Sequence, residues 1–225
     1  MIYIQEKKTR SIKYITIINN MPGSYSQFGQ DVKVLDHHNH KVGGYYVEIG
    51  VHDGKRNSNT YILDKEYQWD GLCVDPFMKN MEERTCIQAN VALGSEPGDS
   101  VPFVGLGKGL GGIKSFATSE NHNNMHHHKT REFDETSVVV RTPQSVLLEA
   151  CTPTTIDYLS LDVEGAEMDI LKSFPHDTYC VALWSIETNN DKGKEREMEE
   201  FMASKGYTFE GHDKAVDHMF SKKCS

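Results

Sequence analysis

Residues 45–54 read YYVEIGVHDG, and this stretch decides the fold. Residues 45–50 form an apolar run that ends in glycine, which predicts a buried strand followed by a sharp turn. On either side, the chain alternates between further apolar runs and helical stretches. The other predicted strands cover residues 71–75, 85–93, 101–104, 137–141, 156–161 and 179–186, with a closing hairpin over 207–210 and 216–220. The predicted helices cover residues 58–66, 76–84, 143–150, 164–173 and 193–205. This alternation predicts an α/β fold with a mostly parallel sheet and helices on both faces.

The composition fits one globular domain and argues against several classes of protein. Of the 225 residues, 37% are hydrophobic, yet no apolar stretch approaches the ~18 residues that a membrane helix needs. A net charge of −9 argues against a nucleic acid partner, because such proteins carry basic patches. The five cysteines are odd in number and lack C-x-x-C spacing, so we expect neither a disulfide framework nor a zinc site. We therefore expect a cytoplasmic, reducing location without membrane association or secretion.

The turn after the first strand combines acidic residues with glycines. Glu48 and Asp53 accompany Gly50 and Gly54, in a pattern that differs from the G-x-G-x-x-G of dinucleotide sites. Acidic side chains suit a cationic ligand, and S-adenosylmethionine carries both a sulfonium and an ammonium group. The alternative is a tight strand-to-helix turn that binds nothing.

The ends of the next two strands supply further candidates. Asp75 ends the second strand, where a carboxylate accepts hydrogen bonds from both hydroxyls of a ribose. The alternative for Asp75 is an N-cap of the following helix. Asn90 ends the third strand, where its amide either contacts an adenine edge or forms a turn.

Several sequence blocks, taken in order, resemble the FkbM family of methyltransferases. They are SQFGQD at 26–31, YVEIGVHDG at 46–54, SNT at 58–60, WDGLCVDP at 69–76 and LSLDVEGAE at 159–167. The resemblance covers residues 26–205 and implies a Rossmann-like methyltransferase fold with a seven-stranded sheet and a C-terminal antiparallel hairpin. Residues 25–225 then form the methyltransferase domain, and residues 1–24 are an N-terminal extension or linker. His52 departs from the family pattern, because relatives often carry Asn or a small residue there.

The resemblance also implies a cofactor, a reaction and a partner. The cofactor is S-adenosylmethionine, and the reaction is methyl transfer to an oxygen of a small-molecule or glycan acceptor, typically a sugar. The implied cofactor-binding residues are Gln27, Glu48, Gly50, His52, Asp53, Gly54, Ser58, Asn59, Asp75, Pro76, Asn90, Val91 and Asp162.

Acidic residues at the ends of two later strands are the catalytic candidates. A neutral sugar hydroxyl is a poor nucleophile and needs a base or a metal. Glu164 is the predicted base, and Asp162 ends the strand beside it. Asp162, Glu187 and Asn189 offer oxygen ligands that suit Mg²⁺ or Mn²⁺. Alternatively, Asp162, Glu164 and Glu167 stabilise the helix start through its dipole.

Residues 105–135 interrupt the pattern of strands and helices. They contain GLGKGLGG at 105–112 and NHNNMHHHK at 121–129, and they match no part of the family pattern. A loop of this length in a compact domain is either functional or disordered, and we expect it to line the acceptor site. His122 and His126 are spaced to bind a metal together, or they belong to a solvated loop.

Two other functions stay open. One is a methyltransferase for another small metabolite or for a nucleic acid hydroxyl, and the acidic charge balance argues against nucleic acid. The other is a cofactor-binding interaction module without catalysis. Asp162 and Glu164 argue against that module, because both acids are needed for catalysis and not for binding alone.

Overall fold

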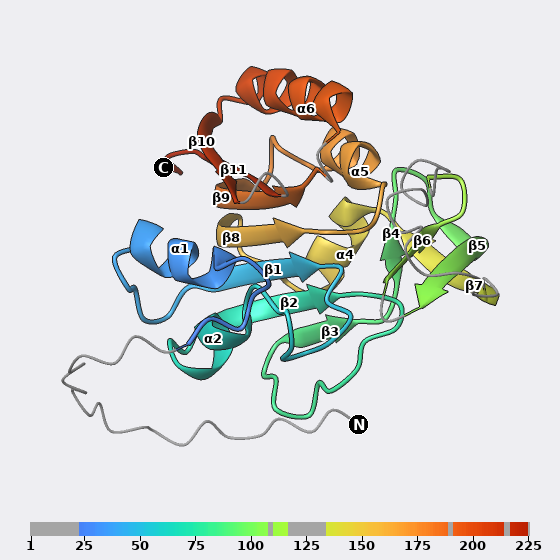
Figure 1. Ribbon diagram of the computed structural model, residues 1–225, viewed down its shortest axis with the longest axis horizontal. Coiled ribbons are helices and arrows are strands. Elements are labelled where there is room, and N and C mark those ends of the chain that lie inside the picture. Colours follow the sequence, from blue (N-terminus) through green and yellow to red (C-terminus); the bar gives the residue numbers. More distant parts are fainter. Residues whose placement is uncertain (1–22, 108–109, 117–133, 189–190, 214–216, 225) are drawn as a thin grey trace.

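The computed structural model describes residues 23–107, 110–116, 134–188, 191–213 and 217–224. A larger sheet lies at the centre with helices on both of its faces, and a smaller sheet lies beyond the tips of its central strands (Figure 1). Most of the expected N-terminal extension, the histidine-rich segment 121–129 and Asn189 lie outside the described residues. In the part of the chain that the structure describes, no helix is long and apolar enough to cross a membrane.

The larger sheet has seven strands in the order β10-β11-β9-β8-β1-β2-β3. They are β1 (Tyr45–Ile49), β2 (Asp70–Val74), β3 (Ile87–Ala89), β8 (Thr155–Leu161), β9 (Cys180–Glu187), β10 (Thr208–Asp213) and β11 (Asp217–Ser221). β8 is the central strand, and its neighbour β1 pairs in parallel with both β8 and β2. The parallel pairing continues to β3 and β9, whereas β11 runs antiparallel to both β9 and β10. The sheet is therefore mixed rather than mostly parallel, because β11 is inserted between β9 and β10 in the opposite direction.

Side chains alternate along the strands and build one hydrophobic core on each face. On one face, α1 (Gln30–His37) and α2 (Tyr61–Lys65) pack over Tyr46 and Tyr158. On the other, Val47 and Leu159 are covered by α4 (Pro143–Glu149), α5 (Glu167–Ser173) and α6 (Lys192–Ser204). The prediction of helices on both faces is confirmed. Since both faces are covered, a ligand has access mainly to the ends of the strands.

The smaller sheet was not predicted. Its order is β4-β7-β5-β6, from β4 (Ala92–Leu93), β7 (Asp134–Arg141), β5 (Gly98–Gly107) and β6 (Leu110–Ile113). β5 and β6 pair antiparallel, and the glycine-rich stretch 105–112 supplies the end of β5 and most of β6. The beginning of segment 105–135, which we expected to lack regular structure, is therefore part of a sheet.

Three element predictions need correction. Residues 76–84 form turns instead of a helix, because Asp75 accepts a hydrogen bond from the Phe77 amide and Asn80 has a positive φ of 52°. The strand predicted over 85–93 is divided between β3 and β4, which belong to different sheets. The C-terminal hairpin is shifted from its predicted bounds, with a register irregularity between Phe209 and Gly211.

The structure also contains two disulfides, Cys73–Cys86 and Cys180–Cys224. This corrects the expectation of unpaired cysteines, and Cys151 is the free cysteine. Neighbouring strands explain both pairs: β2 carries Cys73 beside the start of β3, and Cys180 begins β9 while Cys224 follows its partner β11. Disulfides are typical of oxidising compartments, so they remove the basis for a reducing, cytoplasmic location.

Candidate functional site

A cavity lies at the carboxyl ends of β1, β2 and β8, and the smaller sheet supplies part of its wall. It is lined by Gln27, Ile49, Gly50, Val51, His52, Arg56, Asn57, Val74, Asp75, Pro76, Val91, Ala92, Leu93, Phe103, Gly111, Ile113, Asp162, Val163 and Glu164. The predicted cofactor-binding residues in this lining are Gln27, Gly50, His52, Asp75, Pro76, Val91 and Asp162. The predicted base Glu164 also lines it. Sequence reasoning therefore located the cavity at the edge of the sheet where doubly wound folds bind their ligands.

Gly50 allows the chain to turn directly beneath this cavity. Its amide donates to the Val74 carbonyl, and the Asp162 amide donates to the Ile49 carbonyl. A Cβ atom at Gly50 would lie 1.6 Å from the Asp162 carbonyl oxygen, and its φ of +89° also favours glycine. Glycine at this position lets the ends of β1 and β8 approach each other closely.

Asp75 both holds the turn and faces the cavity. Its Oδ2 accepts from the His52 amide at 3.0 Å, and its Oδ1 accepts from the Phe77 amide at 2.6 Å. The alternative of a helix N-cap is wrong, because no helix follows directly. The carboxylate joins the loops after β1 and β2 and leaves acceptor capacity toward the cavity.

Three acidic side chains converge at one end of the cavity. Carboxylate oxygens of Asp162, Glu164 and Glu187 all lie within 4.8 Å of one another. Burial and the neighbouring Glu164 raise the pKa of Asp162 well above its ordinary value, while a hydrogen bond with Glu187 acts in the opposite direction. Burial, Asp162 and Glu164 likewise raise the pKa of Glu187. The cluster therefore disfavours full ionisation and would gain from a nearby positive charge.

Glu164 occupies an unusual backbone position between β8 and α5. Its φ is 59°, and Gly165 follows with a φ of 121°. The buried Glu167 carboxylate stabilises this turn by accepting from the Val163 amide at 3.2 Å and from the Gly165 amide at 3.0 Å. Burial and the charge of Glu167 raise the pKa of Glu164 to about 7. A carboxylate with this pKa suits proton transfer near neutral pH.

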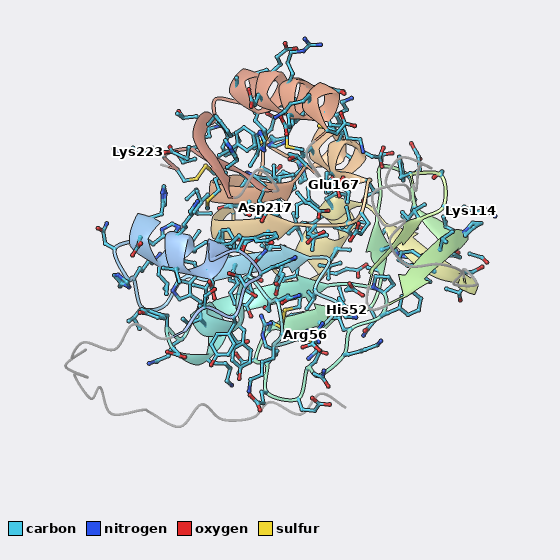
Figure 2. The ribbon with its side chains drawn as sticks, in the orientation of Figure 1. His52, Arg56, Lys114, Glu167, Asp217 and Lys223 are labelled. Carbon is cyan, nitrogen blue, oxygen red and sulfur yellow. A yellow bond between two sulfur atoms is a disulfide. The ribbon has the colours of Figure 1, made fainter. Side chains whose placement is uncertain are left out.

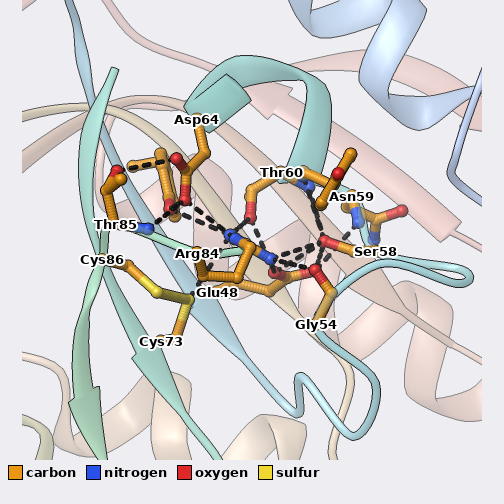
Figure 3. Close-up of a disulfide and its surroundings, with 12 residues drawn as sticks. Glu48, Gly54, Ser58, Asn59, Thr60, Asp64, Cys73, Arg84, Thr85 and Cys86 are labelled. Carbon is orange, nitrogen blue, oxygen red and sulfur yellow. Dashed lines mark hydrogen bonds and ion pairs between the residues drawn. A yellow bond between two sulfur atoms is a disulfide. The ribbon is translucent and has the colours of Figure 1, made fainter. Parts of the chain in front are cut away.

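Glu48 lies outside the cavity, although it was predicted to bind the cofactor. Alternation along β1 sends its side chain to the face that α1 and α2 cover. There the carboxylate accepts from the Ser58 hydroxyl, the Asn59 amide and the Thr60 hydroxyl, and it contacts the Arg84 guanidinium at 3.5 Å (Figure 3). Ser58 and Asn59 belong to this buried network and are absent from the cavity lining. Their predicted contact with the cofactor stays a prediction that this arrangement does not favour.

The other predicted residues lie around the cavity or beyond it. Asp53 shapes the loop after β1, since its carboxylate accepts from the Lys55 and Arg56 amides and from Asn80. The Gly54 amide, in the same loop, donates a hydrogen bond to the Lys79 carbonyl. Asn90 lines a separate surface hollow beside β3, and the predicted metal ligand Asn189 lies outside the described residues.

Sequence reasoning did not single out three notable lining residues, Arg56, Asn57 and Phe103. Arg56 and Asn57 lie between the glycine turn and the S-N-T block (Figure 2 labels Arg56 and His52), so their position could have signalled them. Gly111 and Ile113, from segment 105–135, also line the cavity, and the role of this segment at the acceptor site stays a prediction. Nothing in the sequence indicated that Phe103 lies at the cavity, because the smaller sheet that carries it was not predicted.

Comparison with known proteins bears on this geometry. A family model described as the methyltransferase FkbM domain matches residues 48–209. Searches of curated proteins and of solved structures found no match. The matched range begins at β1, ends within β10 and includes both the glycine turn and the acidic cluster. The chain therefore belongs to the FkbM methyltransferase family.

Proposed function

We propose that the protein is an S-adenosylmethionine-dependent O-methyltransferase that acts on a sugar or glycan hydroxyl. One observation carries the proposal: a single cavity is lined by Asp75, at the end of β2, and by Glu164, whose pKa is raised to about 7. The first is suited to a ribose and the second to a hydroxyl proton. Membership of a methyltransferase family supplies the type of reaction.

The cavity residues fit this cofactor. Asp75 would accept hydrogen bonds from the ribose hydroxyls, and the apolar side chains of Val91 and Leu93 suit the adenine ring. Gly50 leaves the turn after β1 open to close approach. Asp162 would lie near the sulfonium, whose positive charge matches the acidic end of the cavity. When bound, S-adenosylmethionine supplies an electrophilic methyl group.

Glu164 would accept the proton of the acceptor hydroxyl. Its side chain lines the cavity, and the turn stabilised by Glu167 fixes its backbone. Positioning of the hydroxyl behind the methyl group contributes much of the rate enhancement in such a transfer. Phe103 and Ile113 offer an apolar wall for the non-polar face of a sugar ring.

The acidic cluster also fits a divalent cation. Asp162 and Glu187 would hold Mg²⁺ or Mn²⁺ through carboxylate oxygens, which these hard cations prefer. A cation there would lower the pKa of the acceptor hydroxyl and relieve the repulsion among the carboxylates. Asn189 is a further proposed ligand.

Other acceptors are alternatives of the same chemistry. A different small metabolite would use the same base. A nucleic acid hydroxyl is disfavoured by the net charge of −9. A cofactor-binding module without catalysis is disfavoured by the raised pKa of Glu164, because such shifts are typical of groups that transfer protons.

The test begins with calorimetric binding of S-adenosylhomocysteine, the product of the cofactor. Transfer of a labelled methyl group is then measured to separate panels of glycosides, oligonucleotides and small metabolites. We expect binding and transfer to glycosides, and we expect Glu164→Gln to bind the cofactor but to transfer slowly. The matched control is Glu197→Gln, a half-exposed surface residue paired with Lys172. Absence of cofactor binding would refute the proposal, and transfer only to another panel would refute the sugar acceptor.

A further inference from the structure

Arg56 is a cationic side chain in the cavity wall to which the proposed function assigns no role. It is the only arginine or lysine among the described lining residues, and the acidic ones are Asp75, Asp162 and Glu164. Within the described chain, no ion pair joins Arg56 to a carboxylate. The cavity thus presents several negative side chains and one positive side chain to its ligand.

The loop that carries Arg56 has a defined shape. Asp53 Oδ1 accepts from the Lys55 amide at 3.0 Å and from the Arg56 amide at 2.8 Å, and Asn80 donates to Asp53 Oδ2 at 2.6 Å. Burial alone would raise the pKa of Asp53, but these hydrogen bonds lower it below its ordinary value. The carboxylate therefore stays ionised and holds the backbone of Arg56 in place.

Two polar residues accompany Arg56 in the wall. Asn57 follows it directly, and Gln27 enters from the segment before α1. A β-bridge between Ser26 and Asn57 joins these two stretches of chain. Together Gln27, Arg56 and Asn57 form a polar wall with one positive charge, which we call the 27/56/57 wall.

We propose that Arg56 binds the α-carboxylate of S-adenosylmethionine. The inference rests on the proposed function and adds the recognition of the amino acid end of the cofactor. The ribose hydroxyls would bind to the Asp75 carboxylate, and the methyl group must face Glu164 and the acceptor. The amino acid end then extends to the remaining polar lining, which is His52 and the 27/56/57 wall, where Arg56 is the residue with a fixed positive charge. A guanidinium suits a carboxylate there, because its N–H groups match both oxygens of the anion.

Lys55 provides a matched control on the same loop. Its ammonium pairs with Glu83 at 3.3 Å and lies 5.1 Å from the centre of the Tyr61 ring. Lys55 is absent from the cavity lining. Removing either Lys55 or Arg56 changes the net charge of the protein equally, so only a local contact with the ligand distinguishes them.

The experiment compares two ligands that differ by the carboxylate alone, S-adenosylmethionine and decarboxylated S-adenosylmethionine. Calorimetry is run on the full chain without acceptor, for wild type, Arg56→Ala, Arg56→Lys and Lys55→Ala, after thermal melts confirm that each is folded. Arg56→Ala should bind S-adenosylmethionine about tenfold more weakly, as expected for a charge-assisted hydrogen bond at a solvated site. It should bind the decarboxylated ligand as wild type does. Arg56→Lys should lie between these limits, and Lys55→Ala should match wild type for both ligands.

The outcomes separate the inference from the proposed function. If wild type binds neither ligand, the proposed function fails. If wild type binds S-adenosylmethionine and Arg56→Ala binds it equally well, the carboxylate is recognised elsewhere and the inference is overturned. An equal loss of both ligands in Arg56→Ala also overturns it, because the effect would not depend on the carboxylate.

Discussion

Replacing Arg84 with methionine should destabilise the protein strongly without touching the cavity. The Arg84 side chain is fully buried, between the carboxylates of Glu48 (4% exposed) and Asp64 (fully buried). The guanidinium donates to Asp64 at 2.9 Å, to the Gly54 carbonyl at 2.9 Å and to the Thr60 hydroxyl at 2.6 Å (Figure 3). Methionine keeps much of the volume and removes all of these contacts. Two buried carboxylates would then lack their cation.

The expected cost follows from this geometry. Breaking a buried ion pair by removing one partner costs about 3–5 kcal/mol, since the remaining charge is desolvated and uncompensated. For a domain of this size, 1 kcal/mol corresponds to about 2–4 °C in melting temperature. We therefore expect melting about 6–20 °C lower, with a matching loss in the free energy of unfolding by urea.

Arg141→Met is the matched control for Arg84→Met. Arg141 pairs with Asp99 at 3.0 Å, and the Asp99 side chain is 88% exposed. Exposed pairs contribute about 0–1 kcal/mol, so the control should change the urea midpoint little. If Arg84→Met costs no more than Arg141→Met at unchanged m-value, the buried network does not stabilise the fold and the reasoning fails.

Three further predictions concern the cavity. Glu164 accepts a proton only when ionised, and its pKa is about 7, so the rate of methyl transfer should increase as the pH rises through that value. The Glu164→Gln variant should transfer ~10²–10⁴-fold more slowly. A wild-type rate that does not depend on pH would exclude this role of Glu164. The raised pKa values of Asp162, Glu164 and Glu187 remove stability as pH rises from the ordinary carboxyl range toward 7 and above. Mg²⁺ or Mn²⁺ should restore the melting temperature of wild type at high pH but not that of Asp162→Asn, and an equal shift in both would argue against the metal site. Gly50→Ala should cost about 2 kcal/mol or more and abolish cofactor binding, whereas Gly43→Ala, with a φ of +73° and open space around it, should cost only the backbone strain and leave binding intact.

The sequence predicted the parts of the site that depend on strand ends. An apolar run that ends in Gly50 and another that ends beside Asp75 are local patterns, and parallel pairing brings their ends together. Asp162 and Glu164 were predicted in the same way, because they directly follow the apolar run that forms β8. The structure places these residues at the cavity, and one strand with its turn suffices to predict the position of each of them.

Residues that depend on distant contacts were missed. Arg84 lies 36 positions from Glu48, in a stretch expected to form a helix, so no local pattern indicated their ion pair. The disulfides have the same origin, since pairing between strands brings each pair of cysteines within disulfide distance. The prediction for Glu48 failed for a different reason. An acidic residue near a glycine turn suggests a ligand contact, but alternation along β1 directs the Glu48 side chain to the sheet face that α1 and α2 cover.

The smaller sheet has a consequence for how this cavity can be altered. Residues at the carboxyl ends of β1, β2 and β8 contribute one part of the cavity, while Phe103 and Ile113 reach it from a sheet with its own hydrogen-bond ladder and its own small core. Substitutions on β5 and β6 can therefore remodel that wall while the glycine turn and the strand-end acids stay in place. A directed-evolution library focused on these two strands would therefore vary one wall of the cavity while the larger sheet keeps its geometry.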